Sequence, residues 1–488
     1  MPELPDPPQA DEPEAQTLAR AAARGGGVLV GRTIGLQLVT AAATIALARL
    51  LTPADFGVFA VAIAVQRLGL GLSQYGLNSA LIARPADPTA REQHAVTGFS
   101  LFVALLIAGT LMLTAFAIGP ALGAESDYLR AVAIASLSLP FFAGRVIPTA
   151  LLERELAYGR LVLIETADTV FFYVFAVPAA ALGAGALSLA GGVPVGALAG
   201  MAMATLIVPW ARGLSFDLQA IRPLARFGIQ VSGSITLSVS RDFGFVALIA
   251  ALGSSALAGF YAMNQRLLSV PVALQSAIGR VAFPALSKIS DPDQRANSAA
   301  RAAGLTAIVA GLPLTLVTAA TAPMLAVVFG ERWLPTADLV PFAAPAMLMV
   351  ICVAAPLQSL ALSHRRGSLV LGVTAISAVA TLLGAVILVG PYGLEGVGVA
   401  FLLGAVAQTA AMLARSPRAA RRCLDPALRA LVIGAAAAIA GRLATSGDDL
   451  HALIVSAAVA AFVWAALTAL VMRSELRLAF VLARRGRR

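Results

Sequence analysis

Charge is the scarcest property of this 488-residue chain: Asp, Glu, Lys and Arg together make up 12% of it, whereas 59% of the residues are hydrophobic. A soluble globular protein is typically about 25% charged and about 45–50% apolar. The chain therefore has too few charged side chains to cover a water-facing surface. This composition excludes a soluble enzyme, a disordered protein and a disulfide-rich secreted module, and it predicts a protein embedded in a lipid bilayer.

Lysine, histidine and cysteine are also scarce. Lys288 is the only lysine, and it does not belong to a G-x-x-x-x-G-K-[ST] phosphate-binding loop, so the chain lacks that ATPase motif. The three histidines fall in loops or at the ends of apolar segments, which disfavours a histidine proton relay. Cys352 and Cys423 offer neither a disulfide framework nor a metal site. We therefore predict no metal, no cofactor and no ATP hydrolysis.

Apolar segments follow one another from residue 28 onward with short connections. A membrane-spanning helix needs about 20 mostly apolar residues, or about 35 with its connection, which leaves room for about 14 spans and no large soluble domain. The predicted fold class is an all-α polytopic membrane protein with about 14 transmembrane helices. Their approximate ranges are 28–50, 56–78, 95–118, 129–150, 160–183, 187–210, 226–252, 256–285, 302–328, 338–362, 368–389, 394–414, 427–444 and 450–472.

The net charge of +10 is distributed unevenly between alternate connections. With a cytoplasmic N-terminus, the outer connections contain only Arg49, Arg130, Arg332 and Arg442 as basic residues, and nearly all other loop arginines fall on the inner side. Cytoplasmic loops of membrane proteins carry such an excess of basic residues. The pattern predicts a multi-pass protein with both termini in the cytoplasm, and it accounts for the basic charge without nucleic-acid binding.

A short internal repeat indicates a duplication. Residues 50–61 (LLTPADFGVFAV) align with residues 252–263 (LGSSALAGFYAM) at an offset of 202, which matches Gly57 with Gly259. Both segments follow the first span of a six-helix set. Six spans return the chain to the same side of the membrane, so the two sets would have the same orientation, as in parallel-repeat transporters. Chance matching between Ala-, Leu- and Gly-rich helices is the alternative interpretation.

The repeat and the span count together predict the organisation of the chain. We expect two six-helix lobes in parallel duplication, followed by two C-terminal helices. The predicted units are a disordered cytoplasmic tail (1–27), an N-lobe of helices 1–6 (28–212), a C-lobe of helices 7–12 (222–415), two extra helices (427–472) and a basic cytoplasmic tail (473–488).

A few charged residues fall inside predicted spans. Arg32, Arg67, Arg241 and Arg266 lie in the first, second, seventh and eighth spans, and Asp242 follows Arg241. Charged side chains in a membrane usually face the bundle interior or a water-filled cavity, and guanidinium groups bind phosphate well. We therefore predict a central phosphate or pyrophosphate site formed by the four arginines, with Asp242 as a candidate for binding a coupling ion. The alternative is that Arg32, near a span end, extends to the interface.

Other polar residues are interpreted structurally. Glu165 and Asp168 lie three residues apart on one helical face, and we expect them to pair with Arg145 or Arg154. Adjacent residues of a helix do not face each other, so no simple ion pair is expected between Arg241 and Asp242.

The connections expected on the outer side are short. The longest has about a dozen residues and includes the segment 329–333 (FGERW), which we interpret as an interfacial turn anchored by its tryptophan. A membrane-embedded glycan polymerase or ligase would need a larger external loop for its catalytic residues, so this class is disfavoured and we predict no enzyme activity.

Residues 46–60 (ALARLLTPADFGVFA) closely resemble a segment of polysaccharide transporters. In that family a first helix ends in such a turn and is followed by a polar second helix and an exit similar to residues 76–85 (GLNSALIARP). These transporters belong to the multidrug/oligosaccharidyl-lipid/polysaccharide flippase superfamily. The resemblance is sharpest over residues 28–100, and the plan of twelve core helices plus two covers nearly the whole chain.

The resemblance implies a flippase that moves undecaprenyl-pyrophosphate-linked oligosaccharide across the bacterial inner membrane by alternating access, in exopolysaccharide, capsule or O-antigen biosynthesis. Its implied partners are the lipid-linked oligosaccharide, membrane lipids and a polysaccharide polymerase or export machinery. Related lipid II flippases place arginines of helices 1, 2 and 8 in the central cavity, and Arg32, Arg67 and Arg266 occupy similar helices here.

Two further points of the resemblance leave alternatives open. Some relatives bind sodium with carboxylates of helices 7 and 11; Asp242 fits the first, but span 11 offers only Thr374, Ser377 and Thr381, so a sodium site is not expected. The alternative function is a cation-coupled drug or metabolite antiporter of the same superfamily. Its central site would favour carboxylates, which the excess of arginine opposes.

Overall fold

The computed structural model describes residues 39–74, 76–83, 87–118, 126–155, 157–274, 291–363, 366–415, 417–445, 447–473 and 475–477. Throughout these ranges the regular structure is helical, and no strand occurs in them. The predicted N-terminal tail, Arg32 and most of the predicted C-terminal tail lie outside the described residues. The expected all-α fold is confirmed for the part of the chain that the structure describes.

Nine helices in these ranges are long and apolar enough to cross a membrane, or ten if the bent pair Asp127–Gly144 and Val146–Arg154, with its 49° bend, forms one span. The order and bounds are compatible with 14 spans. The elements are the helical segment Val39–Leu50, α2 (Pro53–Gln74), α3 (Leu77–Ala83), α4 (Ala90–Leu113), η1 (Thr114–Ile118), α5 (Ser126–Ser136), α6 (Leu139–Gly144), α7 (Val146–Arg154), α8 (Tyr158–Ala181), α9 (Ala186–Ile207), α10 (Leu218–Leu252), α11 (Ser255–Leu267), α13 (Pro292–Ala319), α14 (Thr321–Met324), η3 (Leu325–Phe329), η4 (Glu331–Leu339), α15 (Val340–Met349), η5 (Val350–Ala354), α16 (Ala355–Ser363), α17 (Gly367–Arg415), α18 (Pro417–Leu443) and α19 (Leu450–Val471).

The 49-residue α17 is two helices joined by a sharp turn. Gly393 has φ 54° and ψ −123°, a conformation that favours glycine because it has no Cβ. The Ser377 hydroxyl donates to the Gly404 carbonyl at 3.0 Å, which shows that the chain folds back on itself across this turn. The single element therefore supplies the separate predicted spans 368–389 and 394–414.

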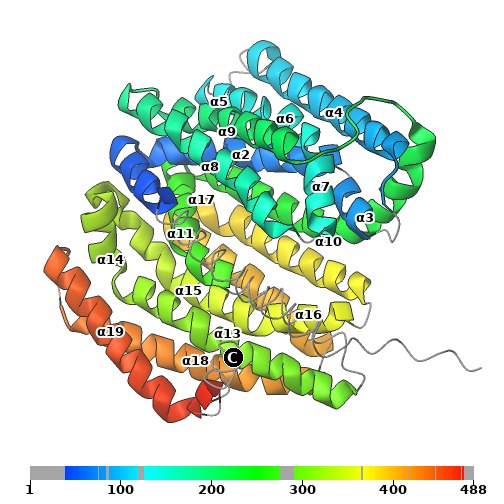
Figure 1. Cartoon of the computed structure of the whole chain (residues 1–488). Coiled ribbons are helices and arrows are strands. Elements are labelled where there is room, and N and C mark those ends of the chain that lie inside the picture. The colour runs from blue at the N-terminus through cyan, green and yellow to red at the C-terminus, as the bar shows by residue number, and fades with distance from the viewer. Residues whose placement is uncertain are drawn as a thin grey trace, which may run out of the picture.

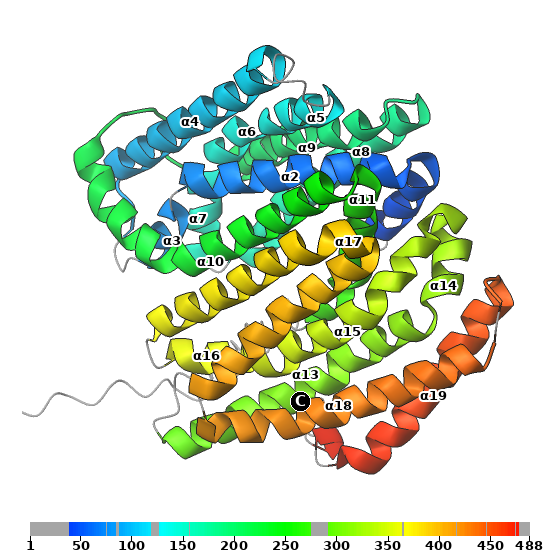
Figure 2. The ribbon, with the colours of Figure 1, turned by 180° about the vertical axis from the view of Figure 1, so that it is seen from behind.

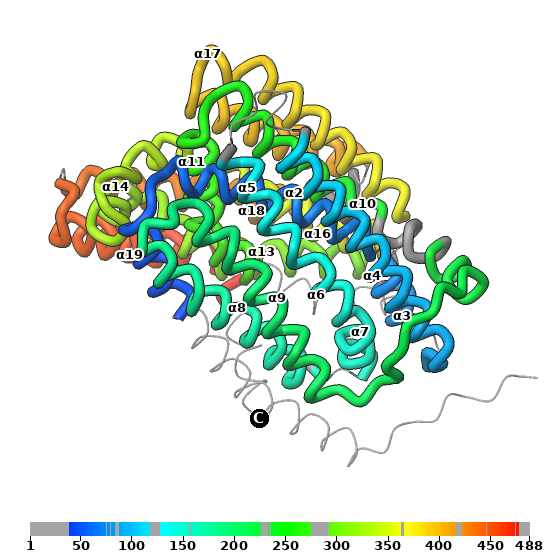
Figure 3. Tube along the Cα trace, turned by 90° about the horizontal axis from the view of Figure 1, so that it is seen from above, coloured from blue at the N-terminus to red at the C-terminus, as the bar shows by residue number. Residues whose placement is uncertain are grey.

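The helices form two groups with α2, α10, α11 and α17 between them. Figure 1 shows α4–α9 on one side and α13, α15, α16, α18 and α19 on the other. From behind, α11 lies between α2 and α17 (Figure 2), and from above the first group lies over α13 and α18 (Figure 3). Helices from the two halves of the sequence thus meet along α2, α10 and α11.

The start of α2 explains the TPADFG motif. The Thr52 amide and hydroxyl donate to Asp55 Oδ2 at 2.9 and 2.7 Å, and the Asp55 amide donates back to Thr52 Oγ1 at 3.2 Å. Pro53, whose missing N–H costs nothing at a helix start, opens the helix. Asp55 Oδ1 also accepts the Ala186 amide at 3.0 Å, so one carboxylate satisfies free amides at the starts of α2 and α9.

The start of α11 repeats part of this arrangement. The Ser254 side chain accepts the Leu257 amide at 3.2 Å, as the Thr52 hydroxyl accepts the Asp55 amide. These two pairs of residues stand at the same offset of 202 that aligns the repeat. The match therefore extends from sequence to the way in which each helix is capped.

Gly57 and Gly259 make reciprocal contacts where α2 meets α11. A Cβ on Gly57 would lie 1.7 Å from the Ser255 carbonyl oxygen, and a Cβ on Gly259 would lie 1.8 Å from the Pro53 carbonyl oxygen. Pro53 and Ser255 also match at the offset of 202. Each glycine thus packs against the first residue of the other helix, at a distance that only glycine permits. This symmetry favours a true duplication over chance matching.

Candidate functional site

The end of the molecule that contains Gly57 and Gly259 is closed by further contacts between the two halves. The Trp333 side chain is 0% exposed, its Nε1 donates to the Ala48 carbonyl at 2.9 Å, and its ring meets Phe56 edge-on at 4.9 Å. Phe260 lies on the same indole, with its ring centroid at 6.3 Å. The expected interfacial anchor at Trp333 is therefore wrong, because the ring is buried between helices from both halves of the sequence.

Two arginines also join the halves at this Gly57–Gly259 end. Arg49 Nε donates to the Val328 carbonyl at 3.1 Å, and Arg332 Nη1 donates to the Leu51 carbonyl at 3.2 Å. In each case the guanidinium satisfies a carbonyl at the end of a helical segment of the other half, where no intrahelical donor is available. These bonds, together with Trp333, hold this end shut.

Arg266, one of the four predicted site arginines, lies between helices of both halves. It belongs to α11, and its guanidinium carbon is 4.9 Å from the centre of the Phe56 ring in α2. Its Nη1 donates to Thr44 Oγ1 at 3.4 Å, and Thr44 is 3.2 Å from the Tyr173 hydroxyl of α8. Throughout the described ranges no carboxylate forms an ion pair with Arg266. Its positive charge is available to an anion that enters between the halves.

Arg67 lies on the same face of α2 as Phe56. Eleven residues separate the two along the helix, which corresponds to three turns plus a rotation of about 20°. Its side chain is exposed and has no hydrogen-bond or ion-pair partner in the described part of the chain, whereas the neighbouring Gln66 is buried and donates to Ser138 Oγ at 3.0 Å. The repeat places Arg266 opposite residue 64 of α2, about one turn from Arg67. The two arginines thus start at similar depths and on facing helices.

Arg241 and Asp242 form the ion pair that their sequence positions argued against. Arg241 Nη2 and Nε lie 2.8 and 3.0 Å from Asp242 Oδ1, because the long arginine side chain turns back along α10 to its neighbour. Arg241 Nη1 also donates to Ser377 Oγ of α17 at 3.3 Å. The Asp242 side chain is 64% exposed, so it remains accessible while its charge is partly compensated.

Arg241 and Arg266 lie at equal distances from the turn that joins α10 to α11. Each is twelve residues from that turn, at Gly253 and Ser254 respectively, which corresponds to about 18 Å along each helix. A hydrocarbon core is about 30 Å thick, so both positions fall near its middle. The structure therefore gives the predicted arginines of the seventh and eighth spans a common depth. Within the described residues Arg241 has a carboxylate partner and Arg266 has none.

The other intramembrane pair is structural, as expected. Arg145 Nη2 lies 2.8 Å from Asp168 Oδ2, and the Arg145 guanidinium stacks 4.3 Å from the centre of the Phe142 ring. A Cβ on Gly200 would lie 2.3 Å from Arg145 Nη1, so α9 packs directly on this pair. Arg154 forms an ion pair with Asp87, at 2.8 Å.

Metal binding finds no support in the described residues, where no group of three or more His, Cys, Asp or Glu side chains gathers. The hydroxyls of Thr374 and Thr381 donate to backbone carbonyls within α17, at 2.9 Å in both cases. Cys352 and Cys423 are free and buried.

Comparison with known proteins identifies the class. The structure superposes on a lipid II flippase MurJ in an inward closed conformation with a TM-score of 0.66 and 12% identity, over 91% of this chain and 98% of that one. An inward-facing MATE multidrug resistance transporter of the MOP superfamily gives a TM-score of 0.56 and 16% identity, over 78% and 95%. The chain therefore shares its fold with these two proteins.

The family follows from the sequence. Residues 46–338, more than half of the chain, match the model described as polysaccharide biosynthesis protein, and the chain belongs to this family. It is 29% identical over 306 residues to the succinoglycan biosynthesis transport protein ExoT of Rhizobium meliloti (strain 1021), covering 62% of this chain and 60% of the relative. It is 26% identical over 342 residues to the lipopolysaccharide biosynthesis protein WzxC of Escherichia coli (strain K12), covering 67% and 64%. The matches thus span less than two thirds of each relative.

Proposed function

We propose that this protein is a flippase that translocates undecaprenyl-pyrophosphate-linked oligosaccharide across the bacterial inner membrane for exopolysaccharide, capsule or O-antigen biosynthesis. Its family, the names of its relatives and its fold support this reading. The main supporting observation is the position of Arg266, which lies between the two halves at mid-membrane depth, with no carboxylate of the described ranges paired with it. An unpaired guanidinium in a low-dielectric region is suited to a pyrophosphate group.

The two halves act in this proposal as lobes of residues 28–212 and 222–415, with the helices of 427–472 beside the second lobe. Rocking of two parallel repeats about a central site gives each side of the membrane access in turn.

The Gly57–Gly259 end is the periplasmic gate, shut in this structure. Gly57→Val should hold it open, because any Cβ there meets the Ser255 carbonyl. A cysteine replacing Leu51, which is buried at this end, would then react faster with a water-soluble thiol reagent. Unchanged labelling would contradict this role.

The substrate site consists of Arg32, Arg67, Arg241 and Arg266. Arg67 and Arg266 bind the pyrophosphate directly, since neither is paired with a carboxylate within the described ranges. Arg241 joins the site with its charge shared by Asp242, and Asp242, being exposed, is the group available to a coupling ion. An oligosaccharide polymerase and an export machinery are the proposed partners that consume the translocated product.

The second candidate function, cation-coupled antiport of drugs or metabolites, is favoured by the exposed Asp242. The groups around Arg266 oppose it, because they are an aromatic ring and the hydroxyls of Thr44 and Tyr173 rather than carboxylates. The matched relatives and structures bear the names of transport, flippase and biosynthesis proteins, so a glycan polymerase or ligase has no comparable support.

Proteoliposomes that contain a fluorescent undecaprenyl-pyrophosphate oligosaccharide test the function. Wild-type protein should make the lipid in the inner leaflet accessible to an external quencher or glycosidase, and Arg67→Ala and Arg266→Ala should slow this step. Arg160→Ala is the matched control, because Arg160 is exposed in the first turn of α8. Normal flipping by both site variants refutes the pyrophosphate site, and no flipping by the wild type, with proton-coupled drug exchange instead, establishes the antiporter.

The proposed orientation has its own test. Reporter fusions at residues 291 and 418 should both give a cytoplasmic signal. Residue 291 precedes α13 and residue 418 lies at the start of α18, in two connections that the proposed 14-span topology places in the cytoplasm. A periplasmic signal at either position would break the 14-span topology with both termini in the cytoplasm.

A further inference from the structure

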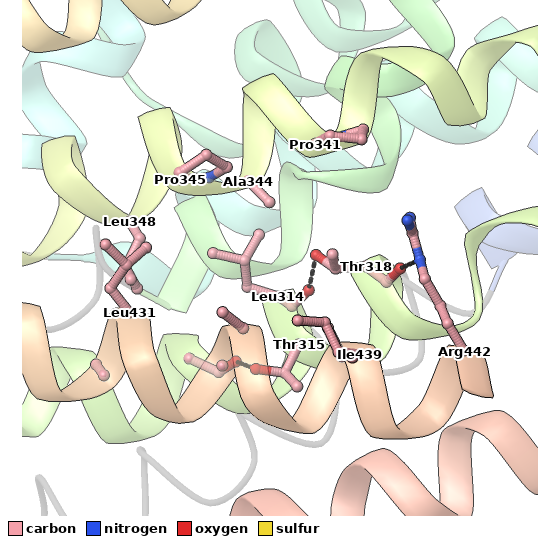
Figure 4. Close-up of a pocket in the computed structure, with 15 residues that line it drawn as sticks. Leu314, Thr315, Thr318, Pro341, Ala344, Pro345, Leu348, Leu431, Ile439 and Arg442 are labelled. Carbon is pink, nitrogen blue, oxygen red and sulfur yellow. Dashed lines mark hydrogen bonds between the residues drawn. The ribbon is translucent and has the colours of Figure 1, made fainter. Parts of the chain in front are cut away.

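A groove lies between α13, α15 and α18, outside the region where α2 meets α11. It has a volume of about 290 Å³, and its walls are apolar except for Thr315, Thr318 and Arg442. Figure 4 shows Leu348 and Leu431 at one end, Leu314 in the middle and Arg442 at the other. Alanine and glycine of α18 face proline and alanine of α15 here, so short side chains leave the space between the helices unfilled.

The groove has the length of one lipid leaflet. From Leu431 to Arg442 the wall of α18 runs through eleven residues, or about 16 Å. Half of a hydrocarbon core is about 15 Å thick. The side of the groove is open, since Ala435, Ile439 and Pro341 are exposed. A chain in the surrounding bilayer therefore has both lateral access and room to lie along α18.

The polar end carries an arginine with free donors. Arg442 Nε donates to the Thr318 carbonyl at 3.1 Å, which fixes the guanidinium at the mouth of the groove (Figure 4). Its Nη1 and Nη2 have no partner in the part of the chain that the structure describes. A cation at the end of an apolar channel of leaflet length matches the charge distribution of a lipid with a negatively charged headgroup.

We propose that this groove binds one acyl chain of an anionic phospholipid, whose phosphate contacts Arg442. In the proposed orientation Arg442 lies at the periplasmic surface, so the lipid belongs to the outer leaflet. It joins α18 to the neighbouring helices α13 and α15, and it fills space that the side chains leave empty. The site is distinct from the proposed pyrophosphate site, because no residue of α2 or α11 lines it.

Native mass spectrometry of the full-length protein in detergent, with added phosphatidylglycerol or phosphatidylcholine, tests the site. Wild-type protein should retain one phosphatidylglycerol about fivefold more tightly than Arg442→Gln does, because one Arg–phosphate contact at a membrane surface accounts for about that ratio. Phosphatidylcholine should bind equally to both proteins. Ala435→Phe, which fills the groove from its exposed side, should weaken retention of both lipids.

The same measurement includes a control variant and has two outcomes that would contradict the proposal. Arg429→Gln removes an arginine of the same helix that is paired with Asp425 and does not line the groove, and it should bind lipid as the wild type does. Equal phosphatidylglycerol retention by the wild type, Arg442→Gln and Ala435→Phe would overturn the proposal. Stoichiometric displacement of phosphatidylglycerol by undecaprenyl phosphate would also overturn it, because the groove would then belong to the transported lipid.

Discussion

Arg145 lies at the bend between α6 and α7 and Arg266 lies in α11, and each guanidinium lies over a phenylalanine ring, at 4.3 Å from Phe142 and 4.9 Å from Phe56. They differ in what compensates their charge. Arg145 has a carboxylate, Asp168, at 2.8 Å, whereas the hydrogen-bond partner of Arg266 among the described residues is the Thr44 hydroxyl, at 3.4 Å. The same residue type therefore stabilises the inside of one half and leaves a charge available between the halves. The presence of a carboxylate is the feature that separates the two roles.

The largest expected effect on stability is that of Asp168→Ala. It leaves the Arg145 guanidinium, whose side chain is 15% exposed, without its counter-charge, and removing one partner of a buried pair costs about 3 kcal/mol. Chemical unfolding in detergent micelles measures the loss. The double variant Asp168→Leu/Arg145→Met should recover most of it. If Asp168→Ala unfolds like the wild type, Arg145 is not a structural charge.

Arg266→Ala, in contrast, should affect transport more than stability. It removes a cation–π contact worth about 2 kcal/mol in a desolvated site, but it also removes an uncompensated charge from the membrane interior, so the free energy of unfolding should fall by less than about 2 kcal/mol. Flipping of the fluorescent lipid should fall about tenfold, because the variant lacks a charge-assisted hydrogen bond to the phosphate. Arg266→Lys should recover part of the rate through its charge alone. A stability loss as large as that of Asp168→Ala would remove the distinction between the two arginines.

Thr44→Glu should give Arg266 a carboxylate partner, as Arg145 has in Asp168. The new carboxylate would lie beside Arg266, where the Thr44 hydroxyl now stands at 3.4 Å, and would compete with the substrate phosphate. We expect several-fold slower flipping. Thr44→Val removes the hydroxyl without adding charge and is the control. Equal rates for both variants would show that pairing of Arg266 does not control transport.

The smallest effect is expected at a water-exposed arginine–aspartate pair. Asp217, which caps α10, accepts a side-chain hydrogen bond from Arg91 and the Ala220 amide, and these bonds lower the pKa of its carboxyl below the usual value. A lowered folded-state pKa stabilises the protein at pH values above the unfolded pKa, and this stabilisation is lost as the pH falls through the folded pKa.

Thermal unfolding of the wild type and Asp217→Asn between about pH 5 and pH 3 tests this pair. Over that range the melting temperature of the wild type should fall slightly more than that of Asp217→Asn. This difference should be smaller in high salt, because exposed charges are screened. A large, salt-independent difference would show that an exposed pair contributes as much as Arg145 and Asp168 do.

Some local features were readable in the sequence because they depend on neighbouring residues. The TPADFG turn is a helix start whose hydrogen bonds join residues three apart, and the offset of 202 pairs it with the start of α11. These predictions needed no knowledge of which helices are neighbours.

Other features depended on contacts between distant residues, and two predictions failed for that reason. Trp333 is buried because residues 48 and 56 fold against it, which no property of its own segment indicates. Arg241 pairs with Asp242 because α17 holds the guanidinium alongside α10 through Ser377. The partners of Arg266, Thr44 and Phe56, come from the other half and had no recognisable signal in the sequence.

The sequence by itself determined that the protein is a multi-pass membrane protein, because a chain that is 12% charged cannot form a water-covered surface. It also predicted which few charges fall within apolar spans. Only the tertiary structure decided which of those charges are paired. Arg145 meets a carboxylate 23 residues away, and Arg266 meets a hydroxyl 222 residues away. Charge compensation acts over a few ångströms of space, so it depends on helix packing rather than on position along the chain.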